Sequence, residues 1–462
     1  GNVAVGSYAM EANTTGESNV AVGVNALEDA TTAGNNTAIG RFALRVNTTG
    51  IQNVAVGANA LDANTIGGNG VAIGYHALTA NTTGGNNIGI GFHALAANNA
   101  NNNVAVGYNA LVSNTSGEGN TAVGLNALGN NTTSNANVAI GRNCLLNNTT
   151  GTNLVAMGAY ALDANTTASN NTAVGYNALT GNTTGDQNVA VGSGALLACT
   201  TGSECVAVGD DALGTMTTGH SNTAVGRHAL LDGTTCTSNT AVGNNSMQNA
   251  TTGSNMVAVG VSALDANTTG HSNVAIGVSA LIANTTGIYN NALGRGALQA
   301  NTTASYNTAM GYFALSANTT SSNNTAFGYG ALSTLSSGDA QVAIGSLASE
   351  TVSTGSRGTS VGHGAGRFSN PNTDNTFIGY FSGYGGSGVT TGVSNTGVGY
   401  ATIYQLTTGN GNTAIGNAAG SDVGSGGNNT FLGQQAGTSS SPSGAITSAN
   451  NQVVLGNNSV SD

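Results

Sequence analysis

The residues that could carry acid–base, redox or metal chemistry are few and scattered. None of the histidines and cysteines has the spacing of a zinc site. The six histidines occupy places where most copies of a repeat, described below, hold Asn or another small polar residue, so we interpret them as surface residues: His76, His93, His220, His228, His271 and His363. The four cysteines, Cys144, Cys199, Cys205 and Cys236, take four different places in that repeat, whereas a disulfide framework would recur with it. We predict small buried thiols, with a local Cys199–Cys205 bridge as the alternative.

Other candidate motifs have simpler explanations. Asp62, Asp163 and Asp265 share one place in the repeat as isolated carboxylates, expected in solvent, and lack the Gly–Asp nonapeptide pattern of calcium-binding rolls. The glycine-rich run 383–388 is not followed by the Gly-Lys-Ser/Thr of a phosphate loop. Many Asn-Thr-Thr triplets match the N-glycosylation sequon, and paired threonines occur in ice-binding solenoids, but a turn needs these residues anyway. The sequence therefore predicts no catalytic, cofactor-binding or metal site, and not an enzyme.

A seventeen-residue repeat organises the chain. The run Asn-Val-Ala-Val-Gly at 2–6 returns at 19–23, and 27 such glycines follow one another, 23 of the 26 intervals being seventeen residues. We number the repeat from this glycine as position zero. Position −4 is usually Asn, −3 Val or Thr, −2 Ala, −1 Val or Ile, +3 and +4 Ala-Leu, and +7 to +10 Asn-Thr-Thr-Gly. A fixed short period indicates small structural units that stack on their neighbours.

The residue types within one repeat predict a β-structure. Positions −4 to −1 favour a strand of about five residues that the glycine ends. Both of its faces carry a regular pattern, so we expect both to be buried, with Val/Ile at −1 and Leu at +4 inside the coil. The Asn-Thr-Thr-Gly run predicts a turn with left-handed backbone angles. Seventeen residues suit one turn of a compact two-strand coil.

The predicted fold is therefore all-β: a parallel β-solenoid, or β-roll, of about 27 coils. Identical side chains, asparagines among them, should form ladders along its axis. At about 4.7–4.9 Å per coil, a rod on the order of 130 Å would result.

The repeat is uniform over residues 1–345 and modified over 346–462. In the second part, position +4 changes from Leu to Gly, and position −2 becomes Phe377 and Phe431. The large residue therefore changes sides within the coil. Two longer intervals predict insertions at 384–391 and 438–449. We predict a uniform solenoid shaft over 1–345 and an irregular continuation of the same solenoid over 346–462.

Composition excludes several function classes. Only 5% of residues are charged, the net charge is −11, and seven arginines are the only basic residues besides histidine. Without a basic patch to neutralise phosphates, we expect no nucleic-acid binding. No apolar run approaches the roughly 18 residues of a membrane span. The sequence begins at Gly1 without Met or a signal-like segment, as expected of a processed product or a fragment.

The recurring Asn-Xaa-Ala-Val/Ile-Gly run resembles the head repeats of trimeric autotransporter adhesins, which form a β-roll from a shorter repeat. A closer resemblance is to trimeric tail-fibre-type proteins of phages and bacteria. It rests on Asn-Thr-Ala-Val-Gly-Tyr-Asn-Ala-Leu at 171–179, Asn-Thr-Phe-Leu-Gly at 429–433 and Gln-Val-Val-Leu-Gly at 452–456. Proteins of that kind commonly continue into a C-terminal intramolecular chaperone, which the sequence up to Asp462 does not contain. The resemblance implies a homotrimer, intertwined or with the chains side by side.

Repeat and resemblance together predict the structural shaft of an extracellular trimeric fibre, a phage tail fibre or a surface adhesin. Such a shaft presents a tip that binds a cell-surface receptor or glycan. We expect recognition to lie outside the uniform coils, because residues 1–345 should offer nearly the same surface every seventeen residues and no singular pocket. The alternative is a subunit of a bacterial extracellular filament that polymerises end to end, through unpaired terminal strands, for attachment or biofilm.

Overall fold

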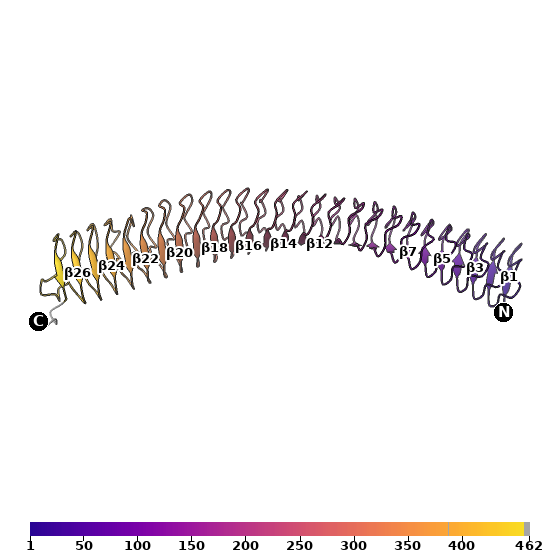
Figure 1. Ribbon diagram of the computed structural model, residues 1–462, viewed down its shortest axis with the longest axis horizontal. Helices are drawn as coiled ribbons and strands as arrows, with labels where there is room; N and C mark the ends of the chain where they lie inside the picture. Colours follow the sequence, from indigo (N-terminus) through magenta and orange to yellow (C-terminus); the bar gives the residue numbers. More distant parts are fainter. Residues whose placement is uncertain (387, 457–462) are drawn as a thin grey trace. The chain divides into compact units, whose positions relative to one another are not determined.

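The computed structural model describes residues 1–386 and 388–456, and the chain divides into two compact units, Gly1–Thr235 and Cys236–Asp462. Both units are all-β, and each coil contributes one strand of three residues (Figure 1). The described residues include no helix, and so none that could cross a membrane.

The first unit holds fourteen strands: β1 (Val3–Val5), β2 (Val20–Val22), β3 (Thr37–Ile39), β4 (Val54–Val56), β5 (Val71–Ile73), β6 (Ile88–Ile90), β7 (Val104–Val106), β8 (Thr121–Val123), β9 (Val138–Ile140), β10 (Val155–Met157), β11 (Thr172–Val174), β12 (Val189–Val191), β13 (Val206–Val208) and β14 (Thr223–Val225). The second unit holds thirteen: β15 (Thr240–Val242), β16 (Val257–Val259), β17 (Val274–Ile276), β18 (Asn291–Leu293), β19 (Thr308–Met310), β20 (Thr325–Phe327), β21 (Val342–Ile344), β22 (Thr359–Val361), β23 (Thr376–Ile378), β24 (Thr396–Val398), β25 (Thr413–Ile415), β26 (Thr430–Leu432) and β27 (Val453–Leu455).

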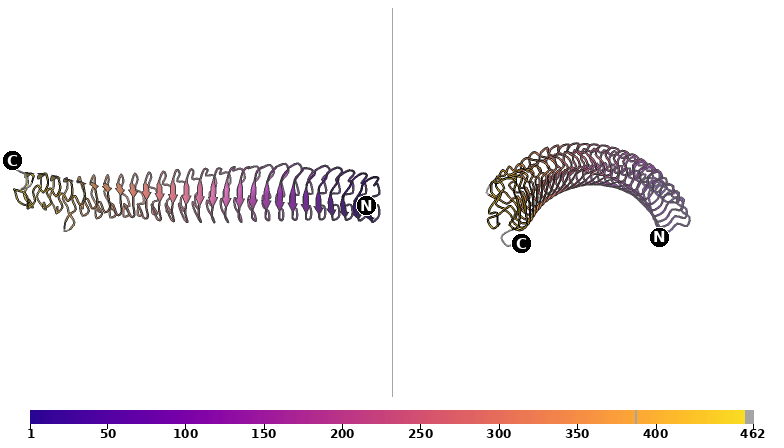
Figure 2. Two further views of the ribbon diagram at one scale, coloured as in Figure 1. Left: turned by 90° about the horizontal axis from the view of Figure 1, so that it is seen from below. Right: turned by 60° about the vertical axis from the view of Figure 1, so that its left-hand side comes forward.

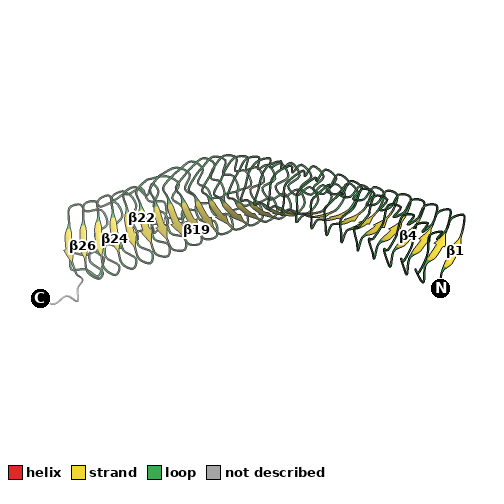
Figure 3. Ribbon diagram, turned by 45° about the vertical axis from the view of Figure 1, so that its right-hand side comes forward, coloured by secondary structure: helices red, strands yellow, loops and turns green. Residues whose placement is uncertain are grey.

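Within each unit, successive strands pair in parallel, and equivalent positions of the repeat lie opposite one another. In β12 and β13, Val189 pairs with Val206, Ala190 with Ala207 and Val191 with Val208. The strands lie side by side on one side of the coils, and turns form the rest of each coil (Figures 2 and 3). The prediction of a parallel β-solenoid with a seventeen-residue repeat is confirmed. The predicted two-strand coil is wrong, and the strand is shorter than the five residues expected.

Left-handed residues close the rest of the coil. Three non-glycine positions per coil have positive φ: position +2, as at Asn177 (54°), position +4, as at Leu179 (52°), and position −5 of the following coil, as at Gln187 (61°). We expected such angles in the Asn-Thr-Thr-Gly turn, but neither Asn182 nor Gly185 has a positive φ. That prediction is wrong because the turn is held instead by buried asparagine side chains, whose hydrogen bonds are described below.

The interior of the coil is narrow and is filled from both sides. Alanine at −2 and +3 and leucine at +4 are fully buried, as at Ala173, Ala178 and Leu179. The expected burial of Leu at +4 is confirmed, whereas the prediction that Val/Ile at −1 lies inside is wrong. The −2 side chain points inward and the side chains at −3 and −1 point outward, leaving Ile39 and Met157 each 41% exposed. With leucine reaching in from the opposite wall, the strand can offer only a methyl group to the interior.

Two ladders of buried asparagines run through the interior. At position −4, the Asn36 amide donates to the Gly50 carbonyl of its own coil (2.9 Å), and its Oδ1 accepts the backbone N–H of Asn53 in the next coil (2.9 Å). At position +7, the Asn64 amide donates to Asn47 Oδ1 of the preceding coil (2.8 Å) and to the carbonyl of Gly67 (3.0 Å). The predicted asparagine ladders are confirmed, and they satisfy turn groups that would otherwise be buried without partners.

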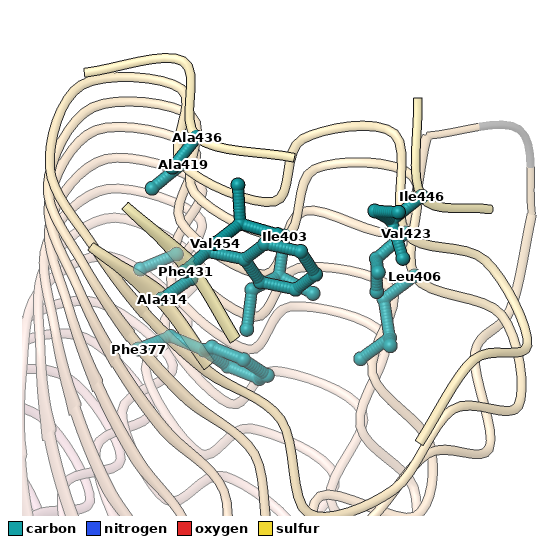
Figure 4. Packing of buried hydrophobic residues seen from close by; sticks show 11 residues of the cluster. Phe377, Ile403, Leu406, Ala414, Ala419, Val423, Phe431, Ala436, Ile446 and Val454 are labelled. Carbon is teal, nitrogen blue, oxygen red and sulfur yellow. The ribbon is translucent and has the colours of Figure 1, made fainter. Parts of the chain in front are cut away.

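The packing changes towards the end of the second unit. Phe377 and Phe431 point inward from position −2, and a Cβ at Gly383 or Gly437 would lie within 2.4 Å of these rings (Figure 4). The predicted change of sides is confirmed: each ring occupies the space that leucine fills elsewhere. Aliphatic side chains replace the asparagine ladder at +7: Leu335, Val352, Leu406 and Val423. The two longer intervals lie between β23 and β24 and between β26 and β27, as the predicted insertions require, although Ser387 of the first lies outside the described residues.

Candidate functional site

The cysteines are interior residues. All four are buried, and Cys199 and Cys205 are not bridged to each other. Burial raises the pKa of the Cys144 and Cys199 thiols to about 12 and raises that of Cys205 as well. These three thiols are therefore packing residues and not nucleophiles or metal ligands, since both roles need the thiolate. The prediction of small buried thiols is confirmed.

The carboxylates at position +5 differ from one another. Asp62 accepts a hydrogen bond from Arg45 Nε at 2.8 Å. Asp163 and Asp265 are half-buried, and desolvation raises the pKa of both carboxyls. Asp163 Oδ1 is buried and has no hydrogen-bond partner among the described residues, so the expectation that these three carboxylates all lie isolated in solvent is wrong.

One group of acidic and histidine side chains comes together through the stacking of coils. Possible metal-ligand atoms of Asp210, Asp211 and His228 lie within 4.8 Å of one another. Arg227 Nε lies 3.6 Å from Asp210 in an ion pair, and His228 Nε2 lies 4.0 Å from Asp211. Positions seventeen residues apart lie in one column, so the period could have predicted the Asp211–His228 contact. Because these pairs account for the group, we assign it no metal.

The side chains at −3 and −1 point outward along the strands of each unit and form a band that we call the outer stripe. Its −1 residues are all apolar, whereas position −3 is Val or Ile in some coils and polar, mostly Thr, in the others. Its members at −1 include Ile39, Ile140, Ile276, Ile344 and Ile415, exposed by 36–43%. The strands between neighbouring coils are already hydrogen-bonded along both edges, as in β12, which pairs with β11 and β13. Any partner must therefore contact the stripe through side chains. Exposed apolar bands of this kind mark interaction surfaces.

A second feature is a groove of about 690 Å³ in the second unit, lined by residues of five successive coils. One wall is aromatic, with Tyr312 and Tyr329 stacked at 5.6 Å between ring centroids and Phe313 edge-on to Tyr312 at 4.4 Å. The rest of the lining is a row of mostly polar residues at position +5 and a row of alanines at position +6: Ile282, Gln299, Ser316, Ser333 and Glu350 in the first row, and Ala283, Ala300 and Ala317 in the second.

The groove exists because position +2 varies between neighbouring coils. Gly330 occupies this position where most coils carry a side chain, and it lines the groove. Gly296, two coils earlier, accommodates the Phe313 ring, since a Cβ there would lie 2.3 Å from Phe313 Cε1. The expectation that residues 1–345 offer no singular pocket is wrong here. The feature of the sequence that could have indicated this groove is glycine at position +2 close to aromatic residues at +1 and +2.

Comparison with known proteins adds no identification. No protein-family model matches the chain, and neither does any curated protein.

Proposed function

We propose that this protein is the structural shaft of an extracellular fibre in which three identical chains associate along their outer stripes, holding a binding tip away from the surface that carries it. The observation that supports it is the outer stripe, whose apolar side chains at −1 repeat in coil after coil of each unit and are covered by nothing among the described residues. Burial of apolar area at about 25 cal/mol per Å² would stabilise an assembly along the whole stripe.

The partner that fits this stripe best is another copy of the chain. A surface with the same seventeen-residue repeat has the same distance between coils, so it can place an aliphatic side chain against every coil. A partner with another repeat would lose this match after a few coils. The number three follows from the resemblance to trimeric tail-fibre-type proteins. The small alanines at −2 do not let the chains approach one another closely, because they are buried inside the coil.

Charges on the stripe should abolish self-association without unfolding the coil. We expect a native mass of about 134 kDa, three times the 44.8 kDa of one chain. The triple variant Val174→Glu, Val191→Glu, Val208→Glu should have the mass of one chain, because three carboxylates per chain would be desolvated in the interface. Native mass spectrometry measures both.

The matched control carries the same three charges on the same coils, away from the stripe. Thr184→Glu, Thr201→Glu and Thr218→Glu replace exposed threonines at position +9 and should leave the native mass unchanged. A native mass of 44.8 kDa for the unmodified chain would contradict the proposal. A series of native masses at many different multiples of 44.8 kDa would favour the alternative function, a filament that polymerises end to end.

The uniform coils should act as a spacer. Removal of residues 108–209, six coils that join Gly107 to Asp210 with the repeat preserved, should shorten the fibre by roughly 28–29 Å and leave its attachment to cells unchanged. Electron microscopy of the fibre and a cell-adhesion assay measure the two effects. Loss of adhesion in a variant that still assembles would make the deleted coils themselves the binding element.

A further inference from the structure

We infer that the groove beside Tyr312 and Tyr329 binds a short, neutral oligosaccharide lying along the stack of coils. Its lining residues all lie between Ile282 and Glu350. Its volume of about 690 Å³ falls within the range of small-molecule sites, which combine apolar walls with a few polar groups.

The aromatic side chains and the polar residues at position +5 suit a ligand with an apolar and a polar side. Tyr312 and Tyr329 are 41% and 57% exposed, so the aromatic wall is open to contact. In the row at position +5, the Gln299 amide makes no hydrogen bond among the described residues, and the hydroxyls of Ser316 and Ser333 each donate to a backbone carbonyl, keeping lone pairs as acceptors. A sugar ring has an apolar C–H face and a rim of hydroxyls, so it can contact both the aromatic side chains and these polar groups.

The charges in the groove favour a neutral ligand. Among the described residues, Glu350 is the one acidic residue that lines the groove, and its Oε2 lies 2.5 Å from Arg367 Nε. This ion pair compensates the carboxylate. An anionic ligand would meet a paired arginine, and a cationic ligand would have to compete for a paired carboxylate.

The backbone beneath the groove excludes recognition by strand addition. The N–H groups of Ala283, Ala300 and Ala317 each donate to a carbonyl of the next coil, at 3.3, 3.0 and 3.1 Å. An extended peptide would find none of these donors available, so recognition depends on side chains. From Gln299 to Glu350 the polar row spans four coils, or about 14 Å, which suits a ligand of several linked rings better than a single one.

The test fills the groove with the side chain that many other coils carry. In Gly330→Asn the backbone should be retained, because its φ of 62° is one that asparagine adopts throughout this chain and the nearest atom to a new Cβ is the flexible Leu347 Cδ2. The neutral probes are cellotriose, maltotriose and N,N′,N″-triacetylchitotriose, with trigalacturonate as the anionic counterpart. Saturation-transfer NMR and calorimetry measure binding.

We expect at least one neutral trisaccharide to bind the unmodified protein, and its affinity to fall at least about tenfold in Gly330→Asn and in Gln299→Ala. The matched control is Gly194→Asn, the same change at the same repeat position in another coil, where φ is 65° and the nearest atom is the Asp211 carboxylate. It should bind like the unmodified protein. The inference is overturned if no neutral trisaccharide binds at about 10 mM, if only trigalacturonate binds, or if Gly330→Asn binds as well as Gly194→Asn.

Discussion

Gly175→Ala is expected to destabilise the first unit by roughly 4–5 kcal/mol, near the upper limit for a single substitution. The φ of Gly175 is 139°, which L-residues rarely adopt. A Cβ at this residue would lie 2.3 Å from the carbonyl oxygen of Gly192 and 2.6 Å from its carbonyl carbon. These are backbone atoms of the next coil, so relief of the clash must separate β11 from β12. Urea unfolding followed by circular dichroism measures the loss.

Gly119→Ala is the matched control for this prediction. Gly119 also has positive φ, 65°, but no atom lies within 4 Å of an added Cβ. Ala136 occupies the equivalent place one coil later with a φ of 56°. The control should lower the free energy of unfolding by only about 1 kcal/mol, the strain of an alanine with left-handed backbone angles. If both variants unfold at the same urea concentration, the contact between glycines of adjacent coils is not the reason that position zero requires glycine.

Leu179→Asp should be comparably destabilising for a different reason. Leu179 is fully buried, so the substitution places a carboxylate in the interior without a cationic partner. Its φ of 52° is one that Asp adopts readily, and backbone strain is therefore not the cause. We expect a loss of roughly 4 kcal/mol or more at pH 7, measured by urea unfolding.

Two further variants separate charge from shape in this prediction. Leu179→Asn has nearly the same shape as Leu179→Asp but no charge, and should be less destabilising. The exposed residue His220 provides the surface comparison, and His220→Ala should change the free energy of unfolding by less than about 0.5 kcal/mol. Equal stability of Leu179→Asp and His220→Ala would show that the inside and outside of the coil are assigned wrongly.

The period, the parallel strands, the buried leucine and the asparagine ladders could be predicted because each depends on residues that recur every seventeen positions. The inward face of the strand could not be chosen from alternation alone, since both faces carry apolar residues. A better signal was available. Where Phe377 replaces alanine at −2, Gly383 replaces leucine at +4, and Phe431 and Gly437 repeat the exchange. Such compensation indicates that both positions face one interior, so −2 points inward and −1 outward.

The groove could not be predicted in the same way, because it depends on differences between neighbouring coils. Gly330 leaves space only in combination with the tyrosines at +1 and the polar row at +5. In a sequence, each of these looks like ordinary variation at one repeat position. The groove can be recognised only when the side chains of several neighbouring coils are considered together.

The asparagine ladder at position −4 gives the solenoid a direction. The side-chain amide donates to a carbonyl of its own coil, and that of Asn36 donates also to Asn19 Oδ1 of the preceding coil. The Oδ1 atom accepts the backbone N–H of the following coil, as from Asn19 to Asn36 and from Asn36 to Asn53. A completed coil therefore presents an oriented acceptor, together with a strand edge, to the next seventeen residues of the chain. During synthesis from the amino end, each finished coil can act as the template for its successor, so that folding proceeds in the order in which the chain emerges.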